Sequence, residues 1–167
     1  MKKIIFLGII LILGFLAYLI FSHNLPIILV KDHFILVKDF LKHKKAFDYL
    51  KKNMPSDQNL PPELSNEKEV KNLIIKKLIE TALYEKEIKK RNLKTEVDQK
   101  INEYLKDLPE YFFVQAEFSY GLQAKDFVNF VIKPYFEYQV LKENGVEVEK
   151  ILDKKSGIII LPWVNLF

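Results

Sequence analysis

The stretch Ile28 to Phe40, ILVKDHFILVKDF, decides the fold that we expect, because the letters ILVKD and a phenylalanine occur in it twice. The first copy predicts a β-strand that ends at Lys31-Asp32, a polar pair suited to a tight turn. The second copy predicts a return strand that leads into a helix near Asp39, where a negative charge is favourable. We therefore predict a short β-hairpin followed by a helix, and not an internal repeat.

Helical periodicity dominates the chain after the hairpin, so we expect a mostly α fold. Apolar residues recur three and four positions apart, which places them on one face of a helix. Asn66 and Glu69 have the form of a capping box, Thr95 is expected to be an N-cap, and Pro134 predicts a kink near residues 130–132. The expected helices cover residues 39–53, 66–91, 95–108, 110–119 and 124–143.

Residues 144–167 are expected to form an apolar C-terminal tail. Gly157 to Phe167 reads GIIILPWVNLF, which is too apolar to be left in water. Three placements are open for it. It can pair as a strand with the hairpin, dock on the helices, or lie at the membrane surface with Trp163 at the level of the lipid headgroups.

Residues 1–21 are expected to form a transmembrane signal-anchor. Lys2 and Lys3 precede an uncharged apolar run from Ile4 to Phe21, which approaches the roughly 20 residues that a membrane-spanning helix needs. A cleaved signal peptide is the alternative, but its apolar region is usually about 7–15 residues long and ends in small residues. The lysines before the run favour a single-pass cell-membrane protein with its body outside the cytoplasm, although Lys31 and later lysines oppose this orientation.

Composition and motifs argue against several classes of function. The net charge of +4 comes from basic residues interleaved with acids, not from a basic patch with aromatic partners, so we expect no nucleic-acid binding. The chain has no cysteine, which removes disulfides and thiolate chemistry. His23, His33 and His43 stand ten apart, a spacing that does not bring metal ligands together. Without a phosphate-binding loop or nucleophile motif, we expect no catalytic residue, metal or cofactor.

The order of these elements resembles the N-terminal chaperone domain of the SurA-like folding factors, a family that includes PrsA and PpiD. The family's hairpin pattern, V-N-G-x-x-I-T-x-x-E-F, is matched at Val30 to Phe40 in its valine, isoleucine, acid and phenylalanine, but not in Asn-Gly or Thr. Leu78 to Lys86 with Asn92 to Asp98, and Gly121 to Val131, resemble two further blocks of the family. The similarity covers about residues 27–143, and the order of the blocks carries it.

This resemblance implies a fold and an activity. Residues 22–143 would form a helical SurA N-terminal-type domain that binds unfolded or nascent exported polypeptides without ATP. In the family a parvulin prolyl-isomerase domain follows, and residues 144–167 lack its motifs, so we expect no isomerase activity. Two alternatives stay open: a structural or scaffolding membrane subunit with one dedicated partner, and the remnant of a parvulin-type peptidyl-prolyl isomerase.

Aromatic residues are the candidate binding site. Phe112 and Phe113, like Tyr135 and Phe136, are adjacent in sequence, so one narrow helical stripe cannot bury both members of a pair. Packing in the core between helices is the simpler explanation for most of them. Aromatic residues that line a groove can instead take up apolar segments by non-directional burial, which tolerates many sequences. The candidate client-binding residues are Phe112, Phe113, Phe118, Tyr120, Phe130, Tyr135 and Phe136.

Overall fold

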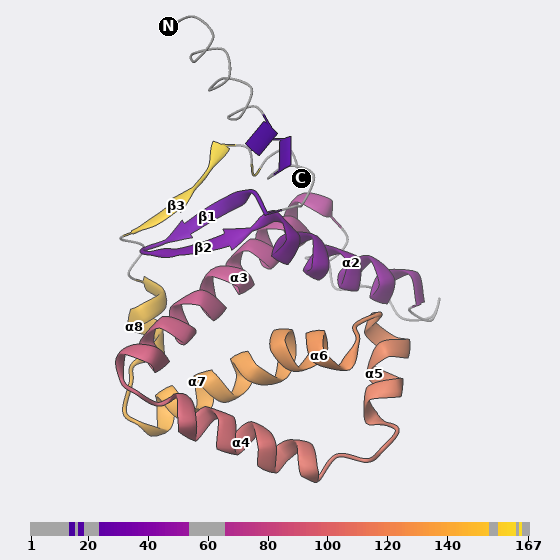
Figure 1. Cartoon of the computed structure of the whole chain (residues 1–167), viewed down its shortest axis with the longest axis vertical. Helices are drawn as coiled ribbons and strands as arrows, with labels where there is room; N and C mark the ends of the chain where they lie inside the picture. The colour runs from indigo at the N-terminus through magenta and orange to yellow at the C-terminus, as the bar shows by residue number, and fades with distance from the viewer. Residues whose placement is uncertain are drawn as a thin grey trace, which may run out of the picture.

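The computed structural model describes residues 14, 15, 17, 18, 24–53, 66–153, 157–162 and 164. Helices dominate this part of the chain, and a small three-stranded antiparallel sheet lies at its upper end in Figure 1. The mostly helical class with a β-hairpin is therefore confirmed. The anchor expected at residues 1–21 lies largely outside the described residues. Among the described helices, none is both long and apolar enough to cross a membrane.

The hairpin forms where the doubled motif predicts it. Strand β1 (Pro26–Val30) pairs with strand β2 (His33–Leu36), and Lys31 adopts a positive φ of 59° in the turn between them. The pairing shifts register between Pro26 and Ile28, so that both Ile27 and Ile28 are fully buried, which regular alternation would not allow.

The second copy of the motif runs from strand into helix, as predicted. Helix α2 (Val37–Asn53) begins two residues before Asp39, and the Asp39 carboxylate accepts a hydrogen bond from the backbone N–H of Leu36 at 3.1 Å. Phe40 then points into the core and is 1% exposed. The same letters therefore form a strand and turn in the first copy, and a strand and helix start in the second.

The tail joins the sheet as a third strand. Strand β3 (Ile158–Ile160) pairs antiparallel with β1, with Ile28 opposite Ile160, so that β1 is central in the order β2-β1-β3. Beyond the strand, the Leu161 N–H donates to the Ile27 carbonyl at 2.9 Å. Of the three placements open for this segment, strand pairing with the hairpin is confirmed, and Trp163 lies outside the described residues.

Helix α3 (Glu67–Lys90) is the longest described element and passes beneath the sheet (Figure 1). The Asn66 side chain accepts from the Lys68 N–H at 2.9 Å, one residue earlier than the expected capping box requires. The helix ends with Asn92 at φ 58° and with the Leu93 N–H donating to the Ile88 carbonyl, which is a Schellman-type end.

Two shorter helices follow the end of α3. Helix α4 (Lys94–Lys106) starts directly after Leu93, so the predicted N-cap at Thr95 is wrong. The reason is that Leu93 already belongs to the end of α3, and its carbonyl accepts from the Val97 N–H in the first turn of α4. Helix α5 (Phe112–Tyr120) ends at Gly121 with φ 63°, as predicted.

The predicted last helix is interrupted. Helix α6 (Ala124–Phe127), the π-helical segment η2 (Val128–Ile132) and helix α7 (Lys133–Glu143) follow without a break, and α8 (Val148–Asp153) comes before the third strand. The irregularity expected from Pro134 is thus a π-helical stretch at residues 128–132.

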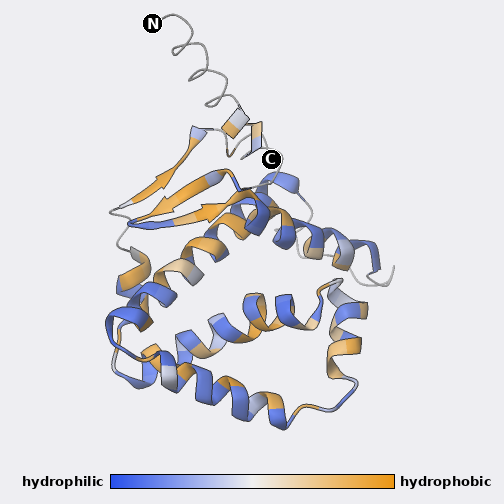
Figure 2. Cartoon of the chain, viewed as in Figure 1, coloured by the Kyte–Doolittle hydropathy of each residue, from blue (hydrophilic) through white to orange (hydrophobic). Residues whose placement is uncertain are grey.

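Two apolar clusters form the core, and α3 contributes to both. The sheet cluster packs the strands and α2 on the first part of α3, while the helical cluster joins the end of α3 to α4, α5 and α7. Figure 2 shows the strands as almost wholly apolar, whereas the helices alternate apolar and polar residues. The molecule therefore has a sheet end and a helical end, which share one long helix.

Candidate functional site

A groove of about 570 Å³ at the helical end is the candidate site, and we call it the aromatic groove. Side chains from α3, α4, α5, α6, η2 and α7 line it, and among those described only Lys77 carries a charge. Its lining residues are Lys77, Tyr84, Tyr104, Phe112, Phe127, Val131, Ile132, Pro134, Tyr135, Phe136 and Tyr138.

The structure brings together three of the seven predicted client-binding residues. Phe112, Tyr135 and Phe136 line the aromatic groove. The ring of Tyr135 stands edge-on to that of Phe136, with centroids 5.2 Å apart, and is itself 57% exposed. These three residues keep their place in the candidate site.

The other four predicted residues lie elsewhere. Phe113 is half-buried against the helical cluster, and Phe118 is 76% exposed outside the groove. Tyr120 is exposed and packs its ring at 5.7 Å from that of Phe127. Phe130 stacks on His43 with centroids 4.3 Å apart and lines a separate pocket of about 370 Å³ beside β2. The lining of the aromatic groove includes none of these four residues.

Eight groove residues were not among the predicted client-binding residues: Lys77, Tyr84, Tyr104, Phe127, Val131, Ile132, Pro134 and Tyr138. Lys77 and Tyr84 are seven positions apart on α3, so they share a face next to its main apolar stripe. This seven-residue spacing is visible in the sequence and could have placed Lys77 and Tyr84 on one face of the helix. The contact of Tyr104 with Phe136, at 5.5 Å between centroids, joins α4 to α7 and has no local signal.

The π-helical segment η2 determines which residues of α7 face the groove. The Lys133 N–H donates to the Val128 carbonyl, five residues back, instead of to the residue four back. Pro134 has no N–H, and its ring would collide with the carbonyl one turn earlier in a regular helix. The wider turn relieves that collision, and it rotates Tyr135 and Phe136 relative to an uninterrupted helix.

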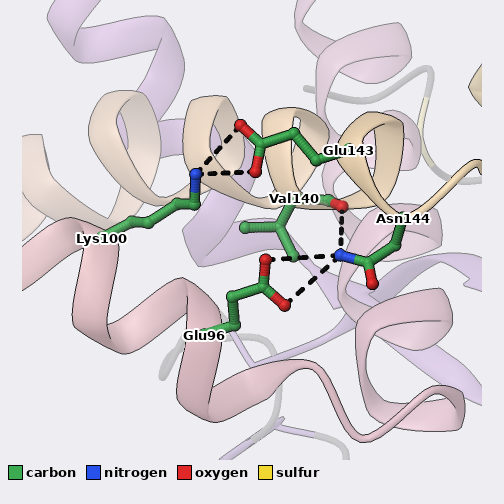
Figure 3. A network of polar contacts seen from close by, with 5 residues as sticks. All are labelled: Glu96, Lys100, Val140, Glu143 and Asn144. Carbon is green, nitrogen blue, oxygen red and sulfur yellow. Dashed lines mark hydrogen bonds and ion pairs between the residues drawn. The ribbon is translucent and has the colours of Figure 1, made fainter.

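Polar contacts hold α4 against α7, which are two walls of the groove (Figure 3). Lys100 pairs with the Glu143 carboxylate at 2.7 Å, and the Asn144 side-chain amide donates to Glu96 at 3.3 Å and to the Val140 carbonyl at 2.9 Å. Glu143 and Asn144 lie at the end of α7, so these contacts fix that helix beyond its aromatic part.

A cluster of three charged side chains lies on α7 and α3, and its buried member is Glu137, which follows Phe136 in sequence. The Lys133 ammonium is 3.1 Å from a Glu85 oxygen and 3.5 Å from a Glu137 oxygen. Glu137 is 1% exposed, and burial raises the pKa of its carboxyl to about 7 although Lys133 opposes the shift. Its second oxygen, Oε2, has no hydrogen-bond partner among the described residues.

Tyr84 of the groove is a neutral hydrogen-bonding group. Burial, together with the nearby Glu80 carboxylate, raises the pKa of Tyr84 to about 12. The Tyr84 ring lies 6.0 Å from that of Tyr138, over which the Lys142 ammonium is placed at 5.5 Å. The groove thus offers apolar ring faces with a few phenol hydroxyls, an arrangement suited to burial of apolar side chains.

The described residues contain no group of three or more His, Cys, Asp or Glu side chains that is placed to hold a metal ion. His43 is half-buried, its Nδ1 lies 2.8 Å from the Asp39 carbonyl, and burial lowers the pKa of its ring. His33 is exposed in β2, and His23 lies outside the described residues.

Comparison of the chain with protein-family models, with curated proteins and with solved structures finds no match in any of the three.

Proposed function

We propose that the protein is a membrane-anchored domain that binds apolar segments of unfolded or partly folded polypeptides outside the cytoplasm, without ATP. The observation that carries this proposal is the aromatic groove, whose described lining is apolar or phenolic except for Lys77. A pocket without convergent charges or a metal cluster is suited to recognition by burial of apolar surface.

The size of the groove matches a short apolar segment. A fully buried leucine or phenylalanine side chain contributes about 1.5–3 kcal/mol. A groove of about 570 Å³ holds a few such side chains, and ordering the bound segment offsets part of that gain. The resulting affinity is modest, which allows release of a client without an energy source.

Two features of the sequence support a membrane location for this activity. The uncharged run Ile4 to Phe21 supports an anchor, and Lys2 and Lys3 before it support an extracytoplasmic body. The resemblance to SurA-like folding factors supports polypeptide clients, since two of its three blocks, Leu78 to Lys86 with Asn92 to Asp98 and Gly121 to Val131, fall on helices that line the aromatic groove.

The groove is tested by aggregation assays on the full chain in detergent micelles, with a reduced, aggregating client. We expect Tyr104→Ser and Tyr135→Ser together to raise the amount of protein needed for half-suppression at least several-fold, because both replace apolar lining. Phe118→Ser is the matched control, since Phe118 is more exposed than either and lies outside the groove. Equal activity of the groove variant and the control would refute the assignment.

A scaffold with one dedicated partner is the second candidate, and an exposed face next to α5 favours it. Tyr111, Val114 and Phe118 are 66%, 70% and 76% exposed, and their spacing places them on one side of the helix. Crosslinking in cells separates the two functions. One stoichiometric product that disappears in Phe118→Ser supports the scaffold, whereas many products that weaken in Tyr135→Ser support client binding.

A further inference from the structure

A second groove, of about 550 Å³, lies at the sheet end between α2 and α3, and we call it the lysine-rimmed groove. Its floor is apolar, with Phe40, Val70, Ile74 and Val164 buried. Its full lining is Phe40, Lys44, Phe47, Asp48, Lys51, Glu67, Lys68, Val70, Lys71, Asn72, Ile74, Ile75, Ile160 and Val164. It shares no residue with the aromatic groove.

Positive charge predominates at the rim of this groove. Four lysines line it, against the two acids Asp48 and Glu67, which leaves a net charge of +2. None of the four ammonium groups forms an ion pair with any residue in the described part of the chain. The rim lysines are Lys44, Lys51, Lys68 and Lys71. Apolar floor and basic rim together suit an anionic amphiphile.

The strand directions place the lysine-rimmed groove near the start of β1, the strand that follows the apolar N-terminal run in sequence. Since β3 is antiparallel to β1, its last residue, Ile160, lies opposite Ile28 near the start of β1, and Ile160 also lines the groove. The Leu25 carbonyl, just before β1, accepts from the Val37 N–H at 2.9 Å. Leu25 is four positions after Phe21, a span of about 14 Å at full extension.

We propose that the lysine-rimmed groove binds anionic phospholipid at the surface of the bilayer that holds residues 4–21. The rim ammonium groups would pair with lipid phosphates, and the floor would cover the glycerol and upper acyl region. This inference rests on the anchor in the proposed function, but not on client binding. We choose membrane lipid as the ligand because only a short segment joins the proposed anchor to the groove, and because Ile160, which lines the groove, presents apolar surface that is 50% exposed.

This contact gives the domain a defined orientation. The sheet end faces the bilayer, and the helical end with the aromatic groove points away from it, toward polypeptides in solution (Figure 1). Each basic residue close to an anionic surface contributes about 1 kcal/mol, which corresponds to roughly a five-fold change in the docked population.

The test uses the absence of cysteine, since single-cysteine variants of the full chain can be labelled uniquely. Asn72→Cys, exposed in the lysine-rimmed groove, and Asp107→Cys, exposed after α4, carry a fluorophore in vesicles with headgroup quenchers. With phosphatidylglycerol mixed into phosphatidylcholine, we expect quenching at residue 72 and little at residue 107. Equal quenching at both positions, or no dependence on phosphatidylglycerol, overturns the proposal.

Charge variants identify the groups responsible. Replacing Lys44, Lys51 and Lys71 by glutamine should lower the docked-to-undocked ratio by roughly 100-fold, at about five-fold per lysine. The matched control replaces three exposed lysines at the helical end, Lys94, Lys106 and Lys125, and should leave quenching unchanged. A similar loss in both triple variants overturns the assignment of the groove.

Three outcomes separate this proposal from the other parts of the function. If the chain resists alkaline carbonate extraction yet residue 72 is unquenched, the anchor stands and the groove assignment fails. If carbonate extracts the chain, the anchor and the lipid contact both fail. Soluble poly-glutamate is also added to the unchanged chain. If it reduces the quenching as much as the lysine replacements do, the groove prefers acidic polypeptide and the lipid assignment is wrong. Aggregation suppression, measured separately, reports only on the aromatic groove.

Discussion

Glu137 is the acidic residue most completely withdrawn from water among the described side chains. It is 1% exposed, and its carboxyl has Lys133 at 3.5 Å but leaves Oε2 unpartnered among the described residues. Burial, reinforced by the Glu85 charge, raises the pKa of this carboxyl from 4.5 to about 7, while Lys133 and Lys89 act in the opposite direction. The group therefore changes charge near neutral pH, one residue away from Phe136 of the aromatic groove.

We expect Glu137→Gln to remove a pH dependence of stability. A carboxyl with a higher pKa in the folded state binds its proton more tightly there, so its contribution is fully present below pH 4.5 and is lost as pH rises through 7. The loss is at most roughly 3 kcal/mol in unfolding free energy. Urea unfolding in micelles at pH 5 and pH 8 should show the variant gaining stability relative to the parent protein at the higher pH.

The comparison with the parent protein matters because His43 titrates with the opposite sign. Burial lowers the pKa of its ring below 6.5, so stability from this group is lost as pH falls through that range. The His43 contribution is the same in both proteins and cancels in the difference. Parallel pH profiles of the variant and the parent would show that Glu137 does not change protonation between pH 5 and 8.

At the scale of elements, η2 and Pro134 form one unit. The π-helical turn holds one residue more than an α-helical turn, and it ends directly before α7, in which Pro134 occupies the first turn. In a regular helix the proline ring would press on the Phe130 carbonyl, at a cost of about 3 kcal/mol. The extra residue thus has a physical role that propensity alone does not reveal.

We expect deletion of Asn129 to be harmful only when Pro134 is present. The deletion returns η2 to α-helical register and so restores the collision with the proline, lowering unfolding free energy by about 3 kcal/mol. Pro134→Ala in the same chain should recover most of that loss, while Pro134→Ala alone changes little. Thermal unfolding followed by circular dichroism measures all three variants. Absence of rescue would mean that packing, and not the proline, maintains the π-helical turn.

The sequence predicts elements better than it predicts how they meet. Hydrophobic periodicity located the helices. The helix end at Gly121 and the turn at Lys31-Asp32 were also predicted correctly, because each depends on the backbone conformation of one or two residues. Thr95 failed as an N-cap because Leu93, held by the end of α3, starts the next helix first. The aromatic groove needs side chains from six elements, and the π-helical turn changes which faces of α7 they meet. Local patterns therefore identified only part of it.

At the scale of the molecule, α3 unites two cores that would otherwise be separate. Its first part, with Leu78 and Leu83, packs in the sheet cluster, and its last part, with Tyr84 and Ile88, packs in the helical cluster. Leu83 and Tyr84, which are adjacent in this helix, thus belong to different clusters. Strand β3 pairs with β1, and Val164, four residues beyond β3, packs in the sheet cluster, so this C-terminal segment lies against the N-terminal hairpin. Residue spacing alone could not choose this placement among the three that were open.

A shared helix predicts that the two clusters unfold together. Leu141 is fully buried in the helical cluster, and Leu141→Ala should cost about 2–5 kcal/mol. The single tryptophan, Trp163, directly precedes in sequence Val164 of the sheet cluster, so its fluorescence is the second signal to follow. In urea, with the full chain in micelles, tryptophan fluorescence and far-ultraviolet circular dichroism should shift to one common lower midpoint.

The matched control for this prediction is Val114→Ala, which removes similar atoms from a side chain that is 70% exposed. It should move both signals by less than about 0.5 kcal/mol, as exposed substitutions usually do. If Leu141→Ala instead leaves the fluorescence midpoint in place while circular dichroism splits into two transitions, the helical end unfolds independently. Helix α3 would then link two separate folding units, and the aromatic groove could open without loss of the sheet.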